Sequence, residues 1–345
     1  MKIILLDDEN SEKWDEFVMS NPEGTFGHLY GWKEVYKIYG YKAFSIAAID
    51  NSDSILGVLQ LFLMRDIFNR KFLISNPFLS YAGVCSNDKE VRLEILSKAK
   101  EIAAENKVQY IELRQLADKA YNLPTKKSFL TMVLNLSNED ELIWKNSLKS
   151  VTRNRIRKAY KQNFQIDYGR DYLDDFYSVL STNFRDLGTP IFPKLFFRNI
   201  FDKFSNLTDL IVVKYKNKVV GGMLVMGYKN MFSDLWVSTL RKYNDLCPNE
   251  LLYWEAIKFA CRNGFEYFDF GRSSINQGTF NFKKKWGAKP VPLYYQYYLN
   301  RANSISQINA VQNSKYQLAI KIWKRLPLII ANRIGPIVVR YLPEF

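Results

Sequence analysis

The chain has 345 residues, of which 47% are hydrophobic and 24% charged, and its 49 Lys and Arg against 35 Asp and Glu give a net charge of +14. This length and apolar content predict two packed globular domains and argue against disorder. One histidine and three cysteines without a C-x-x-C pair make the chain a poor candidate for a zinc site or a disulfide framework, so we expect no metal.

The N-terminal run 1–6 is apolar but too short for a signal peptide, so it predicts a first strand and a cytoplasmic protein. The lone histidine, His28, follows in the aromatic stretch 27–32, and the chain contains no G-x-S-x-G motif. We therefore expect His28 to be a packed or partly exposed side chain at a helix start rather than part of a catalytic triad.

Two parts of the chain follow the same order of strand, amphipathic helix and strand. The first copy comprises residues 54–62, 90–106 and 107–114, and the second comprises 218–226, 249–263 and 264–272. Because this order is common in α/β proteins, chance similarity is the alternative to duplication. We predict a first domain over 1–140, a second over 141–300 and a C-terminal tail over 301–345.

The second copy is the more legible. Two helical stretches within 172–204 are broken near Gly188–Pro190. The β-branched run 210–215 predicts a strand, and residues 232–237 predict a third antiparallel strand. Two helices, an antiparallel meander, a helix and a strand form the order of the GNAT acyltransferase fold.

The segments 267–274 and 278–288 carry a more specific signal, with a Phe-Lys pair shortly before Trp286-Gly287. Together with 77–83 and 149–161, they resemble the FemAB/FemX-like branch of the GNAT superfamily, and most closely its exopolysaccharide-associated members. The resemblance extends from about Gly24 to Leu299. It implies an α/β (α+β) fold with two tandem GNAT-like domains, each a mixed, mostly antiparallel sheet with flanking helices.

The resemblance implies an amide-forming acyl- or aminoacyltransferase that acts on an amine of a cell-envelope or polysaccharide precursor. Lys283 matches the motif lysine, which would stabilise negative charge on the reacting carbonyl oxygen; the alternative is a solvated helix face with Lys284 and Lys285. Asp269 would be a base or orient the acceptor amine, or else form a structural pair with Arg272. We name Lys283, Asp269 and Arg272 as candidate catalytic residues.

We expect donor and acceptor to meet in the second domain, with the first domain helping to bind the acceptor. The candidate substrate-binding residues are Trp32, Tyr81 and Arg114 in the first domain and Arg153, Arg157, Trp236, Asn249, Ser273, Thr279 and Phe282 in the second.

The loop 241–249 corresponds to the glycine-rich turn with which GNAT enzymes hold the CoA pyrophosphate, but it contains no glycine. This departure favours aminoacyl-tRNA or an acyl carrier over acyl-CoA, and we expect no tightly bound cofactor. The alternatives are a CoA-dependent N-acetyltransferase of a small amine and a non-catalytic module that binds anionic lipid or RNA.

The positive charge is concentrated in two stretches without acidic residues. Residues 142–166 contain seven basic residues, of which those at 149, 153, 157 and 161 recur at helical spacing and share one side. Such a stripe suits an anionic donor or precursor, including tRNA. The alternatives are a solvated helix paired with acidic residues and a membrane-facing surface.

The second stretch, 271–343, contains twelve basic residues and ends in an amphipathic tail. In the tail, Leu318, Ile322 and Trp323 lie opposite Lys321 and Lys324, and no run reaches the roughly 18 apolar residues that span a membrane. We expect 315–343 either to contact the inner face of the membrane peripherally or to pack on the first domain.

Overall fold

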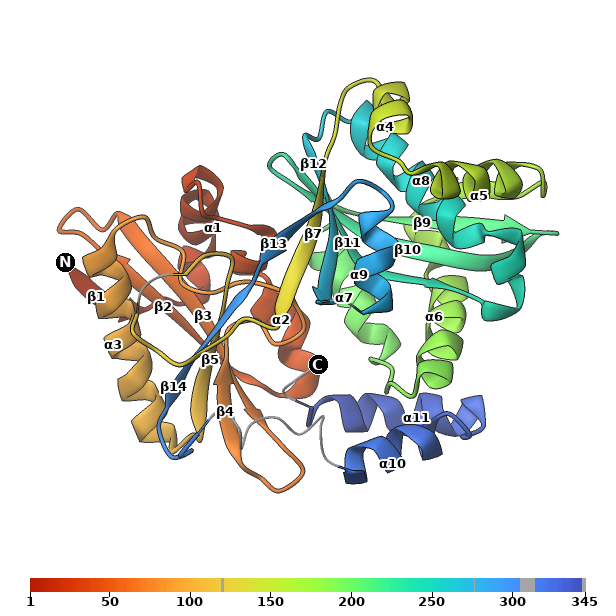
Figure 1. The fold of residues 1–345 in the computed structure, drawn as a ribbon. Helices are drawn as coiled ribbons and strands as arrows, with labels where there is room; N and C mark the ends of the chain where they lie inside the picture. Colours follow the sequence, from red (N-terminus) through yellow and green to blue (C-terminus); the bar gives the residue numbers. More distant parts are fainter. Residues whose placement is uncertain (119–120, 276, 305–313, 343–345) are drawn as a thin grey trace. The chain divides into compact units, whose positions relative to one another are not determined.

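The computed structural model describes residues 1–118, 121–275, 277–304 and 314–342, with the side chains of 314–316 not described. It divides into two compact units, shown in Figure 1. The first unit comprises 1–129, 292–316 and 337–345, and the second comprises 130–291 and 317–336. Residues 305–313 and 343–345 of the predicted tail lie outside the described residues.

The first unit contains a seven-stranded sheet with the order β1-β2-β3-β4-β5-β14-β6. Helix α3 covers one face, and its N-terminus is capped by the Asp88 carboxylate, which accepts from the backbone N–H groups of Glu90 and Val91. The elements are β1 (Lys2–Leu5), α1 (Ser11–Ser20), α2 (Trp32–Tyr36), β2 (Lys42–Ile49), β3 (Ile55–Arg65), β4 (Lys71–Ile74), α3 (Lys89–Asn106), β5 (Tyr110–Gln115), β6 (Thr125–Lys126) and β14 (Tyr294–Leu299).

The second unit contains a seven-stranded sheet with the order β13-β7-β12-β11-β10-β9-β8. Helices α5 and α8 cover one face and α6 and α7 the other (Figure 1). The elements are β7 (Phe129–Asn135), α4 (Asp140–Asn146), α5 (Ser150–Tyr160), β8 (Gln165–Tyr168), α6 (Leu173–Leu187), α7 (Lys194–Lys203), β9 (Thr208–Tyr215), β10 (Lys218–Tyr228), β11 (Met231–Thr239), α8 (Pro248–Arg262), β12 (Tyr267–Ser274), α9 (Gly278–Lys284), β13 (Lys289–Pro292), α10 (Ser314–Trp323) and α11 (Leu328–Val339).

The two sheets have the same topology, which confirms two tandem GNAT-like domains. Four strands of each sheet form an antiparallel meander, and the fourth pairs in parallel with a fifth after an intervening helix. That helix is α3 in the first unit and α8 in the second. The predicted strands and helices are found within a few residues of their expected bounds.

The domain boundaries differ from the continuous ranges 1–140 and 141–300. Strand β14 follows the second unit in the chain but pairs with β5 of the first, from Tyr294↔Gln115 to Leu299↔Tyr110. Strand β7, before position 140, belongs to the sheet of the second unit. The strand next to the fifth one in each sheet therefore comes from outside the continuous segment that forms the first five. It is β14 in the first unit and β7 in the second.

The described tail is divided between the two units: residues 317–336 belong to the second, whereas residues 337–342 belong to the first. The Tyr41 hydroxyl donates to the Arg340 backbone oxygen at 2.8 Å, so only the end of the tail packs on the first domain, as one of the two alternatives expects. Two helices, α10 and α11, form this region, and α11 continues through Pro336. Among the described residues, no helix has both the length and the apolar content needed to cross a membrane.

Candidate functional site

The centre of the second unit is the place where β11 and β12 stop pairing with each other. They pair in parallel only from Met231↔Tyr267 to Ser233↔Asp269, although in this fully described region β11 continues to Thr239 and β12 to Ser274. Gly271 lies just past the last pair with φ +73°, a conformation that favours glycine.

A β-bulge lies in β11 at the same level. Leu224 of β10 pairs with Trp236 and the next residue, Val225, pairs with Asp234, so β11 carries one extra residue. Residues two apart in a regular strand point to the same face. Here they contact opposite layers: Asp234 accepts a hydrogen bond from Tyr253 of α8, whereas the Trp236 ring lies 5.4 Å from that of Phe196 in α7.

Lys283 projects from α9 onto β12 and is only 6% exposed. Its Nζ donates to the backbone oxygens of Gly271 at 2.8 Å and Arg272 at 3.1 Å. Burial lowers the Lys283 pKa, while the negative charges of Asp234 and Asp269 act in the opposite direction. A charged ammonium has three N–H groups, and among the described residues Lys283 Nζ makes these two hydrogen bonds.

The residues around Lys283 explain why its motif has this form. Phe282 and Trp286 pack against the Tyr253 ring at 5.3 and 5.8 Å between centroids. The next residue, Gly287, has φ +83°, and a Cβ there would lie 2.7 Å from the Ser147 backbone oxygen. The aromatic pair and the glycine therefore hold α9 against the core and direct Lys283 toward β12.

Asp234 is a buried carboxyl group that the sequence analysis did not single out. Its Oδ2 accepts from the Tyr253 hydroxyl at 2.6 Å, and the residue is 9% exposed. Burial raises its pKa to about 7, against the opposing effects of the Tyr253 hydrogen bond and the positive charge of Lys283. A carboxyl group that titrates near neutral pH is suited to exchanging protons during catalysis.

Asp269 is 2% exposed, and its Oδ1 accepts from the Thr131 hydroxyl and, at 2.8 Å, from the Gly271 N–H. These contacts join β7 to β12 and hold the turn at Gly271. The third predicted catalytic residue, Arg272, is half-buried on β12.

The other predicted residues of the second unit are dispersed around this centre. Ser273 is buried on β12, Asn249 is half-buried at the start of α8, and Thr279 is exposed on α9. The Arg153 guanidinium donates to the backbone oxygens of Trp144 and Leu148. Arg157 is exposed and lies over the Trp144 ring at 5.4 Å.

The start of α8, which corresponds to the predicted donor loop, already contains an ion pair. Pro248 opens the helix and has no N–H, and the Glu250 carboxylate in the first turn accepts from Arg155 at 2.5 Å. An acidic side chain here interacts favourably with the positive end of the helix. The Glu250 carboxylate thus supplies, at this helix N-terminus, the negative charge that a bound diphosphate would supply.

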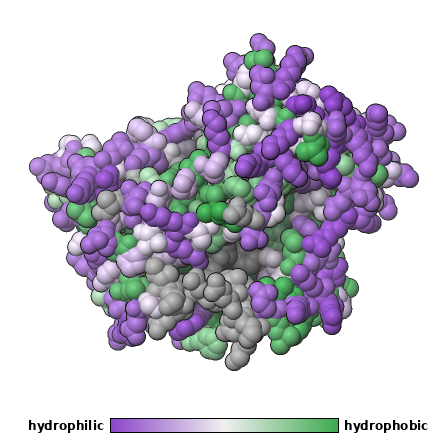
Figure 2. All heavy atoms as spheres, in the orientation of Figure 1, coloured by the Kyte–Doolittle hydropathy of each residue, from purple (hydrophilic) through white to green (hydrophobic). Residues whose placement is uncertain are grey.

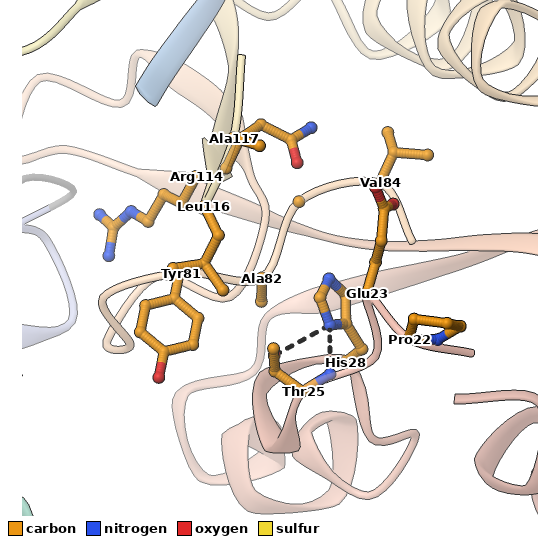
Figure 3. A pocket seen from close by; sticks show the side chains of 12 residues that line it. Pro22, Glu23, Thr25, His28, Tyr81, Ala82, Val84, Arg114, Leu116 and Ala117 are labelled. Carbon is orange, nitrogen blue, oxygen red and sulfur yellow. Dashed lines mark hydrogen bonds between the residues drawn. The ribbon is translucent and has the colours of Figure 1, made fainter. Parts of the chain in front are cut away.

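In the first unit, Tyr81 and Arg114 line a cavity of about 140 Å³ together with His28 and Leu116, as Figure 3 shows. Arg114 is 1% exposed, pairs with Glu112 at 2.7 Å and donates to two backbone oxygens. Its guanidinium is thus held by the protein itself.

Two further first-unit residues have structural partners. The fully buried Trp32 donates from Nε1 to the Phe26 oxygen. His28 Nδ1 accepts from the Thr25 N–H at 3.0 Å, which places the proton of a neutral ring on Nε2. His28 thus caps a short 3₁₀ helix, Phe26–His28, as a packed residue.

The comparisons with known proteins agree with this architecture. Residues 146–284 match the acetyltransferase (GNAT) domain family. A Lipid II:glycine glycyltransferase of Staphylococcus epidermidis is 22% identical over 372 residues, covering 80% of this chain and 88% of that protein. The crystal structure of FemX matches with a TM-score of 0.70 and 18% identity, over 89% of this chain and all of that one.

Residues 146–284 therefore contain a GNAT domain, and the chain as a whole has the fold of FemX. The match marks the second unit as an acyltransferase domain. The fold is also shared with the C-terminal domain of a putative lysylphosphatidylglycerol synthetase from Agrobacterium fabrum, with a TM-score of 0.60 at 12% identity.

Another cavity of the second unit, about 620 Å³ in volume, contains none of the predicted site residues. It is lined by Thr208, Gly227 and Phe232, at the end of the meander that contains the β10–β11 turn. The candidate site is therefore the buried group of charged residues around Lys283, and not this cavity.

Proposed function

We propose that this protein transfers an acyl or aminoacyl group to an amine of a cell-envelope or polysaccharide precursor, with the chemistry at Lys283 and Asp234. The observation that carries the proposal is the buried Lys283 ammonium, which is fixed where β11 and β12 stop pairing. The nearby carboxyl groups of Asp234 and Asp269 favour its charged form. The glycyltransferase name of the staphylococcal relatives supports an envelope precursor as acceptor.

In the proposed reaction, the acceptor nitrogen attacks the carbonyl carbon of the donor. The new C–N bond forms as the ester C–O bond breaks, and the leaving oxygen takes one proton from the amine. Starting from an ammonium, a second proton must leave, and Asp234 in its ionised form accepts it. Lys283 stabilises the negative charge that develops on the carbonyl oxygen.

For the donor, we propose aminoacyl-tRNA rather than acyl-CoA. The Glu250 carboxylate at the start of α8, together with the missing Pro248 N–H, disfavours a pyrophosphate at this helix terminus. On α5 and just beyond it, Arg157, Lys158 and Lys161 are exposed and present positive charge suited to a phosphate backbone. We further propose that the protein works on the cytoplasmic side of the membrane, where a lipid-linked acceptor would be presented.

The decisive experiment measures transfer of labelled glycine from glycyl-tRNA to lipid II by the wild type and Lys283→Ala. The loss of one charge-stabilising donor is expected to lower kcat about 10²–10³-fold. Lys284→Ala is the matched control, because its side chain is exposed on the same helix. Full activity of Lys283→Ala would contradict the assigned role.

Donor choice is tested by calorimetry with acetyl-CoA and by filter binding with tRNA. We expect tRNA to bind and acetyl-CoA to give no measurable heat. Tight acetyl-CoA binding without tRNA binding would instead favour a CoA-dependent N-acetyltransferase.

A further inference from the structure

Residues 317–336 of the tail pack against the second unit. Arg185 of α6 donates to the Leu326 oxygen at 2.9 Å, and a Cβ on Gly188 would lie 2.6 Å from Ile320. Ala331 is 2% exposed, and a Cβ on Gly335 would lie 2.9 Å from the Ile191 nitrogen. Residues 317–336 therefore contact the α6–α7 region through Ile320, Ala331 and Gly335.

The same segment also exposes large aliphatic residues to solvent. Ile329 is 73% exposed, and four others are 36–58% exposed. We call this surface the tail face; its apolar members are Leu318, Ile322, Ile329, Ile330 and Ile334. Figure 2 shows apolar atoms at the surface in the region of α10 and α11, beside hydrophilic ones.

The tail face also carries positive charge without negative charge. Residues 317–336 contain no Asp or Glu, and their exposed basic residues are Lys321, Lys324, Arg325 and Arg333. Of these, Lys324 lies beside Gly188, at the edge of the contact with α6. Exposed isoleucines among cations suit a surface that is apolar beneath a layer of anionic groups. A second copy of this chain fits poorly, because pairing two tail faces would bring like charges together.

We infer that the tail face docks on an anionic lipid bilayer, with its isoleucines entering the headgroup region and its cations contacting lipid phosphates. This inference rests on the proposed function in one respect: it supplies the membrane surface on which a lipid-linked acceptor would be met. The binding itself requires neither donor nor acceptor.

The test measures partitioning of the full-length protein onto vesicles of equal phosphatidylglycerol and phosphatidylcholine by flotation. Ile329→Ser/Ile330→Ser is expected to lower the partition coefficient at least about tenfold, because the exposed apolar area is lost. Lys321→Ala/Lys324→Ala/Arg325→Ala is expected to lower it about fivefold per charge at low salt, and only on anionic vesicles.

The matched control is Leu142→Ser/Leu195→Ser, which removes two apolar residues of similar exposure on α4 and α7. This control should change partitioning less than about twofold. Thermal unfolding of each variant identifies those that have lost the fold. Wild-type partitioning of a folded Ile329→Ser/Ile330→Ser variant would overturn the inference, as would a solution dimer that the same substitutions dissociate.

Transfer to a soluble acceptor analogue separates the two proposals. If the wild-type protein fails to bind vesicles but still transfers the acyl group to the soluble analogue, only the inference of membrane docking is rejected. Vesicle binding without transfer would reject the proposed function alone.

Discussion

Asp234→Asn tests the proposed proton acceptor with little change in shape. An asparagine oxygen can still accept from the Tyr253 hydroxyl, which lies 2.6 Å from Asp234 Oδ2. Asparagine does not ionise, so the substitution removes the proton-accepting capacity while it preserves the main contact of the side chain.

The magnitude follows from the pKa of Asp234, which burial raises from 3.8 to about 7. This difference corresponds to about 4 kcal/mol in favour of the protonated carboxyl group in the folded protein. Between about pH 4 and pH 7 the unfolded chain has lost this proton while the folded protein retains it. Wild-type stability should therefore fall as the pH rises through this range and level off above it.

Two measurements check this reasoning. Chemical denaturation at pH 5 and pH 8 gives the unfolding free energy at each pH. The decrease in this free energy from pH 5 to pH 8 should be smaller for Asp234→Asn than for the wild type. Single-turnover transfer from labelled aminoacyl-tRNA should rise with pH through an apparent pKa near 7 in the wild type. In Asp234→Asn the rate should be at least about 10²-fold lower, and this rise should be absent.

The exposed Asp202→Asn on α7 is the control and should retain the wild-type profile. Asp269→Asn compares the two carboxyl groups, because Asp269 is engaged with Thr131 and Gly271. A wild-type rate and pH profile in Asp234→Asn would refute the assignment. A lower rate with an unchanged pH profile would show that Asp234 only positions other groups.

Two further substitutions test the support of the site and its donor surface. Gly287→Ala should destabilise the protein by more than Gly264→Ala in thermal or chemical unfolding. Both glycines have positive φ, which costs about 1–2 kcal/mol for alanine. Only at Gly287 would the added Cβ meet neighbouring atoms. Equal losses would show that the contact with Ser147 relaxes freely. Arg157→Ala/Lys161→Ala should weaken tRNA binding and lower the steepness of log K against log salt by about 0.7–0.9 per lost phosphate contact. The control Lys203→Ala/Lys218→Ala removes the same charge from exposed positions and should leave both the affinity and the slope unchanged. An unchanged slope in the first pair would place the tRNA elsewhere.

The sequence by itself determined the elements and their repetition. Apolar periodicity and turn residues are local signals, so the strands, the break at Gly188–Pro190 and the helix of 249–263 were predicted close to their observed bounds. The motif around Lys283 was also legible, because a lysine between aromatic residues and before Trp286-Gly287 is a short-range pattern.

Only the tertiary structure decided the domain boundaries and the surroundings of each charged group. The membership of β7 and β14 depends on pairing with strands far away in the chain, which no local pattern encodes. Asp234 is one acid in a predicted strand until a bulge in β11 brings it to Tyr253 and away from the layer of Trp236. Its raised pKa arises from burial by α8 and its neighbours, since desolvation belongs to the packed protein and not to the residue type.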